Sequence, residues 1–424
     1  MNKLKIYLSR LICFVVILIF TTLAIPSAYS FAAAEPPKLN SEGATLMDAT
    51  TGQVLYSKNG DTKYFPASTT KILTALVVLE HAKLDDKVTV GKNPPSADGT
   101  SVGIKTGEIF TVRELLLGLL MESGNDCAEA LAEHVSGSCG EFAKLMNERA
   151  KELGAKNSNF KNPSGLPDPE HVTTSNDYSL IMKEAIKNPD FLAIDRTTSL
   201  QLPVSNLGEK RWLNNHNYIL LKNSNYYYPF SVASKKGYTI EAKFTTVISA
   251  TKNGHTLIVT CLKGEDINKV YEDVTNLMNY GFDNFTQVKL YSEGDVIDSI
   301  SIDDGTSVPL LAGKDIYYTV KTSEQDNLKK SIEYKAPTDL ANKTLIRGEI
   351  LTKGQVFLNG EELQDIDLAS GISREYNSET AVKTFYEKHT TAIVLLGGGV
   401  VLLFITMTRR KRIRQIIRKL RINK

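Results

Sequence analysis

The sequence is poor in the residues that build disulfide scaffolds and metal sites. Its 424 residues include four cysteines, six histidines and one tryptophan. Four cysteines are too few for a disulfide framework, and Cys13 lies in a segment that we expect to be removed. The histidines are scattered, and neither His-Glu-x-x-His nor Cys-x-x-Cys occurs. We therefore expect no metal site and no cofactor.

Net charge is also small, at +2, but the charges are unevenly distributed. Nine basic and no acidic residues lie in 409–424, and three basic residues lie among the first ten. Without these twelve residues the rest of the chain carries about −10. An acidic main body argues against nucleic acid as its partner.

Two long apolar runs lie near the ends. Residues 11–25 form a run of 15 after a basic start and before small residues, which is the layout of a secretory signal peptide over 1–34. Residues 390–408 are uncharged over 19 positions, as in a transmembrane helix, and the basic block 409–424 follows. Because basic residues favour the cytoplasmic side, we expect a single-pass cell-membrane protein with its main body outside and its tail in the cytoplasm.

Between the ends the pattern changes once. Helical and strand patterns alternate over 37–286, whereas short strand-like runs with frequent turns fill 287–375. We therefore expect a mixed α/β domain followed by a small all-β domain, with residues 376–389 as a charged connector to the span. The individual elements that we expect are strands within 43–56, 232–236, 244–250 and 255–262, helices over 72–79, 111–121 and 126–135, and a mostly helical segment over 173–193.

One motif opens an apolar helix. The stretch Ser68-Thr-Thr-Lys71 precedes the run 72–79, which is typical of a helix buried on most sides. Residues three apart share a helix face and their side chains lean toward the N-terminus, so Lys71 should lie over the Ser68 hydroxyl. Burial and the helix dipole would lower the pKa of Lys71, and a neutral amine can take the serine proton.

The same spacing also occurs at Ser158 to Lys161 and at Ser249 to Lys252, so the pattern alone is weak. Ser158 lies in a loop and Ser249 ends an expected strand. Only Ser68 opens a long apolar helix. For an isolated match, the alternative is a serine helix cap beside a solvated lysine.

Two further polar stretches stand at comparable positions. Ser123-Gly124-Asn125 is a short turn between two apolar helices, where side chains can be presented to a cleft. Its alternative interpretation is a helix cap. Lys235-Lys236-Gly237 begins a strand of the expected sheet, and here the alternative is a lysine-rich strand edge that guards against edge pairing.

In this order, the three stretches resemble the Ser-x-x-Lys, Ser-x-Asn and Lys-Thr-Gly motifs of the low-molecular-mass penicillin-binding proteins, which are serine-type D-alanyl-D-alanine carboxypeptidases. The flanking residues agree, including Asn162-Pro-Ser-Gly-Leu166 and Gly237-Tyr-Thr239. The resemblance covers about 37–375. It implies a β-lactamase/transpeptidase-like domain, with an antiparallel sheet flanked by helices, before the small all-β domain and the C-terminal transmembrane helix.

The resemblance also implies catalytic roles. Ser68 would be the acylated nucleophile and Lys71 its base. Ser123 would relay the proton to the leaving D-alanine. Water would then hydrolyse the acyl-enzyme.

Three further residues would bind the substrate. Asn125 would hold the substrate amide and Lys235 would attract its terminal carboxylate. The N–H groups of Ser68 and Tyr238 would form the oxyanion hole. The implied partners are the peptidoglycan pentapeptide ending in D-Ala-D-Ala and, as acylating inhibitors, β-lactam antibiotics.

Two positions depart from the family pattern. Lys236 replaces the threonine of Lys-Thr-Gly, and Ser164 replaces the histidine of Asn-Pro-His-Gly-Leu. Because successive side chains of a strand alternate, we expect Lys236 to point toward bound substrate if Lys235 points inward.

Several alternatives stay open at this stage. The chain could be a weak or inactive wall-binding protein, or a β-lactamase or esterase on the same fold. The sequence does not separate carboxypeptidase from endopeptidase or transpeptidase. Cys127 and Cys139 are twelve residues apart, and a bridge between them is also open.

Overall fold

The chain folds into two compact units. The computed structural model describes residues 35–302, 305–338, 340–376 and 378–422. One unit contains the residues up to 287 together with 319–326, and the other contains 288–318 and the residues from 327 onward. The expected signal peptide over 1–34 lies outside the described residues.

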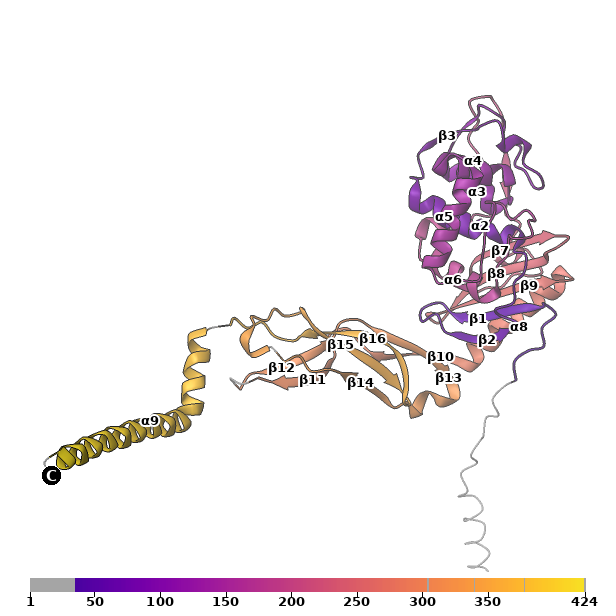
Figure 1. Cartoon of the computed structure of the whole chain (residues 1–424). Helices are drawn as coiled ribbons and strands as arrows, with labels where there is room; N and C mark the ends of the chain where they lie inside the picture. Colours follow the sequence, from indigo (N-terminus) through magenta and orange to yellow (C-terminus); the bar gives the residue numbers. More distant parts are fainter. Residues whose placement is uncertain (1–34, 303–304, 339, 377, 423–424) are drawn as a thin grey trace, which may run out of the picture. The chain divides into compact units, whose positions relative to one another are not determined.

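An antiparallel five-stranded sheet of order β2-β1-β9-β8-β7 forms the centre of the first unit (Figure 1). The turn Asn253-Gly254 joins β8 to β9, as expected for this dipeptide between two alternating runs. The strands are β1 (Gly43–Asp48), β2 (Val54–Lys58), β7 (Ser231–Thr239), β8 (Lys243–Lys252) and β9 (His255–Gly264).

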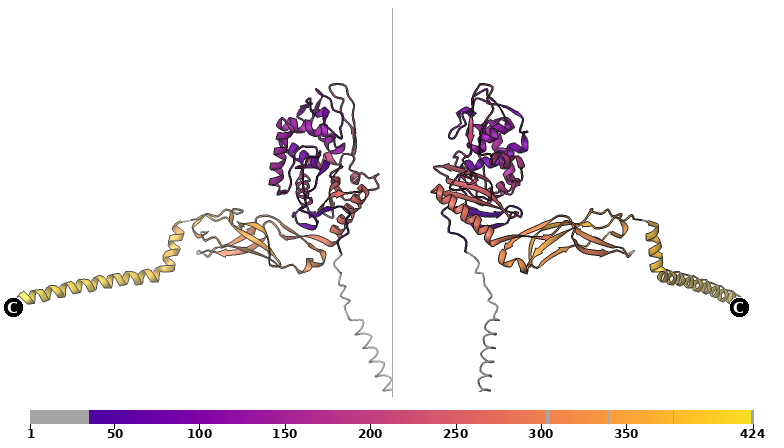
Figure 2. Two further views of the ribbon diagram at one scale, coloured as in Figure 1. Left: turned by 45° about the vertical axis from the view of Figure 1, so that its right-hand side comes forward. Right: turned by 180° about the vertical axis from the view of Figure 1, so that it is seen from behind.

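Helices cover both faces of this sheet. Successive side chains of a strand point to opposite faces, and apolar side chains are buried on each face. Val247 packs into the core formed with the helices on one side, and Ile248 packs against α8 (Ile267–Asn284) on the other. The two further views show α8 apart from the other helices of this unit (Figure 2). Those other helices are α2 (Lys71–His81), α3 (Val112–Met121), α4 (Asn125–Ser136), α5 (Cys139–Glu152), α6 (Ser175–Ala185) and α7 (Pro189–Asp195).

Helix α2 is the buried helix predicted from the apolar run. All residues from Lys71 to Val78 are buried, and the 3-10 turn η1 (Ala67–Thr70) leads directly into it. Thr111 caps α3 through a capping box with Glu114, which explains why that helix begins where the sequence indicates.

The segment 173–193 is mostly helical, as expected, and its helical residues form two helices, α6 and α7. The break has a local cause, because the side chain of Asn188 caps the next helix and Pro189 occupies its first turn.

Two short strand pairs complete the first unit. Strand β3 (Lys87–Thr89) pairs with β4 (Ile109–Thr111), and β5 (Ser199–Gln201) pairs with β6 (Trp212–Asn214). Residues 202–211 form the tip of the second hairpin. The 3-10 turn η3 (Tyr218–Leu220) lies between this hairpin and β7.

The second unit is mainly β structure, as expected. Its five-stranded sheet has the order β11-β12-β16-β15-β14, and β10 pairs with β13. The strands of the sheet are β11 (Val296–Ser301), β12 (Ser307–Ala312), β14 (Lys330–Tyr334), β15 (Ile350–Leu358) and β16 (Glu361–Ser370), whereas the residues of β10 (Phe285–Tyr291) and β13 (Ile316–Lys321) are divided between the two units.

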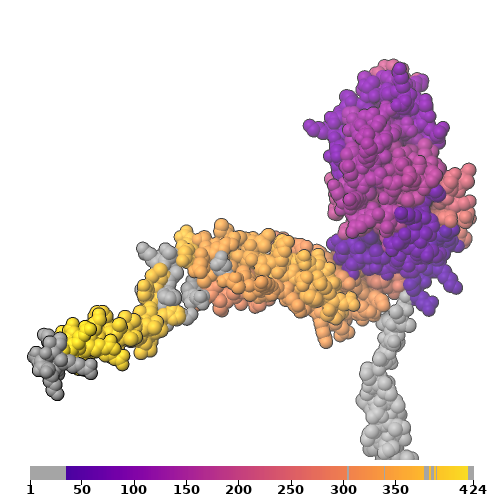
Figure 3. All heavy atoms as spheres, in the orientation of Figure 1, coloured from indigo at the N-terminus to yellow at the C-terminus, as the bar shows by residue number. Residues whose placement is uncertain are grey.

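One long helix, α9 (Ser378–Ile422), contains the expected membrane span. Within it, the stretch 389–418 contains a window that is apolar and long enough to cross a bilayer, and none of that window is buried by other residues (Figure 3, yellow). The helix also includes most of the segment expected to be a connector and most of the basic tail. The fold class predicted from the sequence, mixed α/β followed by β structure and an apolar C-terminal helix, is confirmed.

Candidate active site

Ser68 and Lys71 meet at the start of α2, as their spacing predicts. Ser68 lies in η1, and the Nζ atom of Lys71 is 3.1 Å from Ser68 Oγ. Lys71 is completely buried. Neither η1 nor α2 has a side-chain cap, so the alternative interpretation of Ser68 as a helix cap does not hold.

Two carbonyl oxygens hold the Lys71 amine against the serine. Nζ donates to Asn125 Oδ1 at 2.7 Å and to the Ser164 carbonyl oxygen at 2.6 Å. A neutral amine has two N–H bonds and one lone pair. If both N–H bonds point to these oxygens, the lone pair remains for the Ser68 hydroxyl proton.

The environment favours this neutral form of Lys71. Burial lowers the pKa of Lys71 well below its usual range, and the positive charge of Lys235 lowers it further. A lysine with a lowered pKa can act as a general base near neutral pH.

Ser123 points into the site from a strained backbone. Its φ angle is +62°, a region that non-glycine residues rarely occupy and that costs about 1–3 kcal/mol. The side chain does not cap α4, because that helix has no side-chain cap. Instead, Ser123 Oγ lies 3.2 Å from Lys235 Nζ.

Lys235 is a buried cation on β7. Only 2% of its surface is exposed. Burial lowers the pKa of Lys235 to about 7, while Asp195 opposes this shift and Lys236 adds to it. Asp195 is also buried, on α7, and its Oδ2 accepts a hydrogen bond from the backbone N–H of Ser234.

Gly237 lets β7 pass very close to Ser68. A Cβ atom at this position would lie 2.6 Å from the backbone nitrogen of Ser68 and 2.7 Å from Thr245 Oγ1. No side chain fits there, so only glycine keeps the strand against the serine. Tyr238, the next residue, is exposed beside the same cleft.

These residues line one cleft of about 510 Å³. Ser68, Ser123, Lys235, Gly237 and Tyr238 all contribute to its wall. Asn125 and Lys71 lie beneath the wall and are joined to it through Ser68. The structure therefore brings together the six site residues singled out from the sequence, which are Ser68, Lys71, Ser123, Asn125, Lys235 and Tyr238.

Lys236 also lines the cleft, and its ammonium group lies against the ring of Tyr218. Its Nζ lies 4.3 Å from the centre of the Tyr218 ring, a cation–π contact. Its backbone N–H donates to Asn217 Oδ1 at 3.1 Å. Among the residues that the structure describes, no carboxylate forms an ion pair with Lys236.

Sequence reasoning missed several contributors to the site. The Ser164 carbonyl holds Lys71, so the contribution of this residue does not depend on its side chain. The next residue, Gly165, has a φ of +90° and packs directly against the Ala67 carbonyl group. A Cβ atom at this position would lie 1.8 Å from the Ala67 carbonyl oxygen, so only glycine fits. The Asn-Pro-Ser-Gly turn was the available signal for this loop.

A second missed group forms the far wall of the cleft. His216 Nε2 and Glu122 Oε2 are 2.8 Å apart. Tyr218, Tyr226 and Tyr271 complete this wall. Glu122 directly precedes the Ser123 turn, whereas the histidine and the three tyrosines come from η3, α8 and the loops around η3, where no sequence pattern marks them.

The other two Ser-x-x-Lys matches do not form such sites. Ser158 Oγ donates to Asp177 Oδ2 at 2.7 Å, and Ser249 is buried within β8. The open question of a bridge is also answered, since Cys127 and Cys139 are free thiols. Among the described residues no group of histidine, cysteine and carboxylate side chains could hold a metal ion.

Two family profiles match this chain. The peptidase S11 family, D-alanyl-D-alanine carboxypeptidase, matches residues 30–266. The C-terminal domain of penicillin-binding protein 5 matches residues 285–375.

Individual proteins give the same result. D-alanyl-D-alanine carboxypeptidase DacF of Bacillus subtilis is 32% identical over 381 residues, which cover 87% of this chain and 94% of that protein. The structure of penicillin-binding protein 5 from Haemophilus influenzae has a TM-score of 0.68 at 26% identity and covers 80% of this chain and 99% of that one. The S96A mutant of Streptomyces K15 DD-transpeptidase has a TM-score of 0.55 at 32% identity, covering 58% of this chain and 99% of that one.

Proposed function

This chain belongs to the peptidase S11 family of D-alanyl-D-alanine carboxypeptidases, and from this membership we propose that it removes the terminal D-alanine of peptidoglycan stem peptides through an acyl-enzyme on Ser68. It is a serine hydrolase of the penicillin-binding protein type. Among the alternatives weighed from the sequence, membership of this family favours the carboxypeptidase.

The observation that carries the proposal is the Lys71 amine. It lies 3.1 Å from Ser68 Oγ and is fixed by two oxygen acceptors, Asn125 Oδ1 and the Ser164 carbonyl. A buried lysine without a carboxylate at these distances is costly as a cation, so the neutral base is favoured. A hydroxyl and a base in this arrangement form an activated nucleophile.

In the first step Ser68 Oγ attacks the carbonyl carbon of the penultimate D-alanine while Lys71 Nζ takes the hydroxyl proton. The negative charge that develops on the carbonyl oxygen would be stabilised by the N–H groups of Ser68 and Tyr238. Gly237, the residue before Tyr238, permits the strand to lie close to the Ser68 backbone nitrogen.

In the second step the carbon–nitrogen bond breaks, and the nitrogen of the leaving D-alanine takes the proton that Lys71 removed, relayed through the Ser123 hydroxyl, so that Lys71 is neutral again. Ser123 is placed to deliver this proton, because Ser123 Oγ lies beside the Lys235 ammonium. Lys235 would attract the substrate carboxylate, and Asn125 would hold the substrate amide. Water then attacks the ester of Ser68 and releases the shortened peptide.

We further propose how the chain is arranged at the membrane. The carboxypeptidase domain would span 37–286, the β domain 287–375 and the connector 376–389. Helix α9 would cross the bilayer over 390–408 and leave the basic tail, 409–424, in the cytoplasm. The exposed apolar surface of α9 supports this anchoring.

A direct test measures D-alanine released from a peptide ending in D-Ala-D-Ala by the full chain in detergent. We expect release by the wild type and none above background by Ser68→Ala. Ser158→Ala is the matched control, because it removes a serine from the same spacing pattern outside the cleft. Equal release by the wild type and Ser68→Ala would overturn the assignment of the nucleophile.

A further inference from the structure

A network of side chains outside the cleft fixes a backbone segment on which Asn125 depends. Residues 97–108 form neither helix nor strand. Two carbonyl oxygens of this segment accept hydrogen bonds from Asn125: Asp98 O from the side-chain Nδ2 at 2.6 Å, and Thr100 O from the backbone nitrogen at 2.7 Å. The orientation of the Asn125 amide, and hence its contact with Lys71, therefore depends on where this segment lies.

Asp126 holds the N–H side of the segment. Its buried carboxylate accepts hydrogen bonds from the backbone nitrogens of Val102, Gly103 and Ile104 at 3.1, 2.9 and 3.2 Å. It also accepts one from Ser101 Oγ at 2.7 Å. Asp126 directly follows Asn125 in the first turn of α4, so the segment is held by the neighbour of the residue that depends on it.

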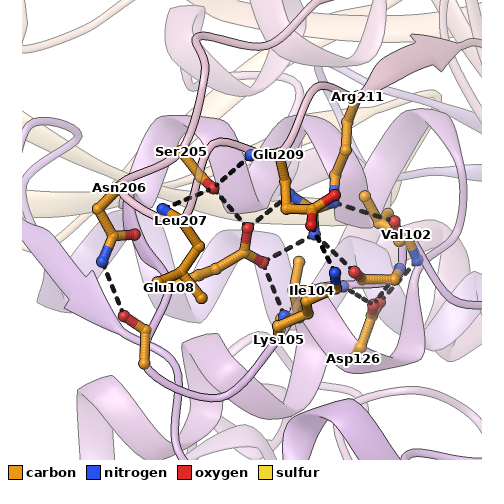
Figure 4. A network of polar contacts seen from close by, with 12 residues as sticks. Val102, Ile104, Lys105, Glu108, Asp126, Ser205, Asn206, Leu207, Glu209 and Arg211 are labelled. Carbon is orange, nitrogen blue, oxygen red and sulfur yellow. Dashed lines mark hydrogen bonds and ion pairs between the residues drawn. The ribbon is translucent and has the colours of Figure 1, made fainter.

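Arg211 holds the carbonyl side of the same peptide groups, from the end of the β5–β6 hairpin (Figure 4). Its Nε donates to Val102 O at 3.3 Å and its Nη2 to Gly103 O at 2.6 Å. The guanidinium also binds both oxygens of Glu108, at 2.8 and 2.7 Å. Glu108 is completely buried and accepts a further hydrogen bond from Ser205 Oγ at 2.6 Å.

We propose that Arg211 and Glu108 are positioning residues for the reaction: the pair clamps the segment 98–104 and so sets the Asn125 amide that orients Lys71. The inference rests on the proposed function of that site. The guanidinium fork is needed because it must reach Glu108 and two carbonyl oxygens at once, which a lysine ammonium does not do in this planar geometry.

The clamp can be separated from stability. Removing one partner of a buried ion pair is strongly destabilising because the other charge is left unpaired, so both partners are neutralised together. The informative variants are therefore Glu108→Gln combined with Arg211→Gln, and the single change Arg211→Lys. The control is Glu209→Gln, which removes the exposed 2.5 Å pair with Lys105 between the same two loops but does not touch Val102 or Gly103.

We expect kcat for D-alanine release to fall about ten- to a hundredfold in Arg211→Lys and in the double variant, because a misplacement near 1 Å costs on the order of a hundredfold. KM and the melting temperature should stay close to those of Glu209→Gln, which should match the wild type. Values of kcat within about twofold of wild type in folded Arg211→Lys would overturn the clamp.

Failure of the double variant to fold, and failure of the proposed function, can each be told apart from failure of the clamp. If the double variant does not fold, Arg211→Lys decides alone, because it retains the charge pair. If the wild type releases no D-alanine, the proposed function fails instead. The clamp is then tested by the rate of acylation by a fluorescent penicillin, expressed as the rate for the variant divided by the rate for the wild type. A ratio near one would then overturn the clamp, and a fall of about tenfold or more would support it.

Discussion

Lys236 is the position where a single substitution is expected to raise activity. In the structure its ammonium rests on the Tyr218 ring at 4.3 Å, a contact that contributes about 0.5–1 kcal/mol at partly exposed sites. To reach a substrate carboxylate, the ammonium must give up this contact. Its charge also lowers the pKa of Lys235, after the larger effect of burial, and so reduces the positive charge near neutral pH on the residue that we propose binds the substrate carboxylate.

Threonine at this position avoids both costs. Its hydroxyl can donate a charge-assisted hydrogen bond, which contributes about 1.5–3 kcal/mol. Allowing for the lost charge of Lys236, we expect a net gain of about 1–2 kcal/mol in Lys236→Thr, equivalent to roughly a five- to thirtyfold rise in kcat/KM. Because the pKa of Lys235 should rise, the decline of kcat/KM on the alkaline side should also move to higher pH.

The assay is D-alanine release across pH 6 to 10, with thermal unfolding measured in parallel. Lys236→Met is the control, because it removes the charge and keeps the length but offers no hydroxyl. It should reproduce the pH shift without the full rise in kcat/KM. A lower kcat/KM in Lys236→Thr than in the wild type would refute this reasoning and make Lys236 a working carboxylate anchor.

Three further predictions follow from the structure. Gly237→Ala should lower kcat/KM about a hundredfold, because its Cβ meets the Ser68 nitrogen at 2.6 Å; Gly140→Ala, where nothing lies closer than 4.0 Å, should have no effect on this rate. Burial lowers the pKa of His171 to about 4 from an unfolded value near 6.5, so protonation favours unfolding, and the stability of the wild type relative to His171→Gln should fall as the pH decreases from 6.5 to 4; a constant difference in denaturant titrations would contradict this. Protease added outside intact cells should digest the main body and spare 409–424, and protection of the main body would reverse the proposed topology.

Local features of the fold and site could be predicted because their causes are local. The contact between Lys71 and Ser68 follows from three-residue spacing at the start of a helix. The β8–β9 hairpin follows from Asn253-Gly254. The break between α6 and α7 has an equally local cause in Asn188-Pro189, which the prediction of a mostly helical segment did not place.

Contacts between distant segments could not be predicted from the residues themselves. Lys71 and the Ser164 carbonyl are 93 residues apart, and Ser123 and Lys235 are 112 apart. Only the ordered motifs, through their family resemblance, indicated that Ser123 and Lys235 meet. Strand alternation does not determine where a long side chain ends, so it gave no sign that Lys236 would rest on the ring of Tyr218.

The central claim is that Ser68 is the acylated nucleophile, and covalent labelling tests it most directly. The full chain in detergent is reacted with a penicillin, digested and mapped by mass spectrometry. A β-lactam acylates the serine that attacks the substrate carbonyl, so we predict one adduct, on the peptide that contains Ser68, and none in Ser68→Ala. An adduct on another residue, or labelling that survives Ser68→Ala, would contradict the account.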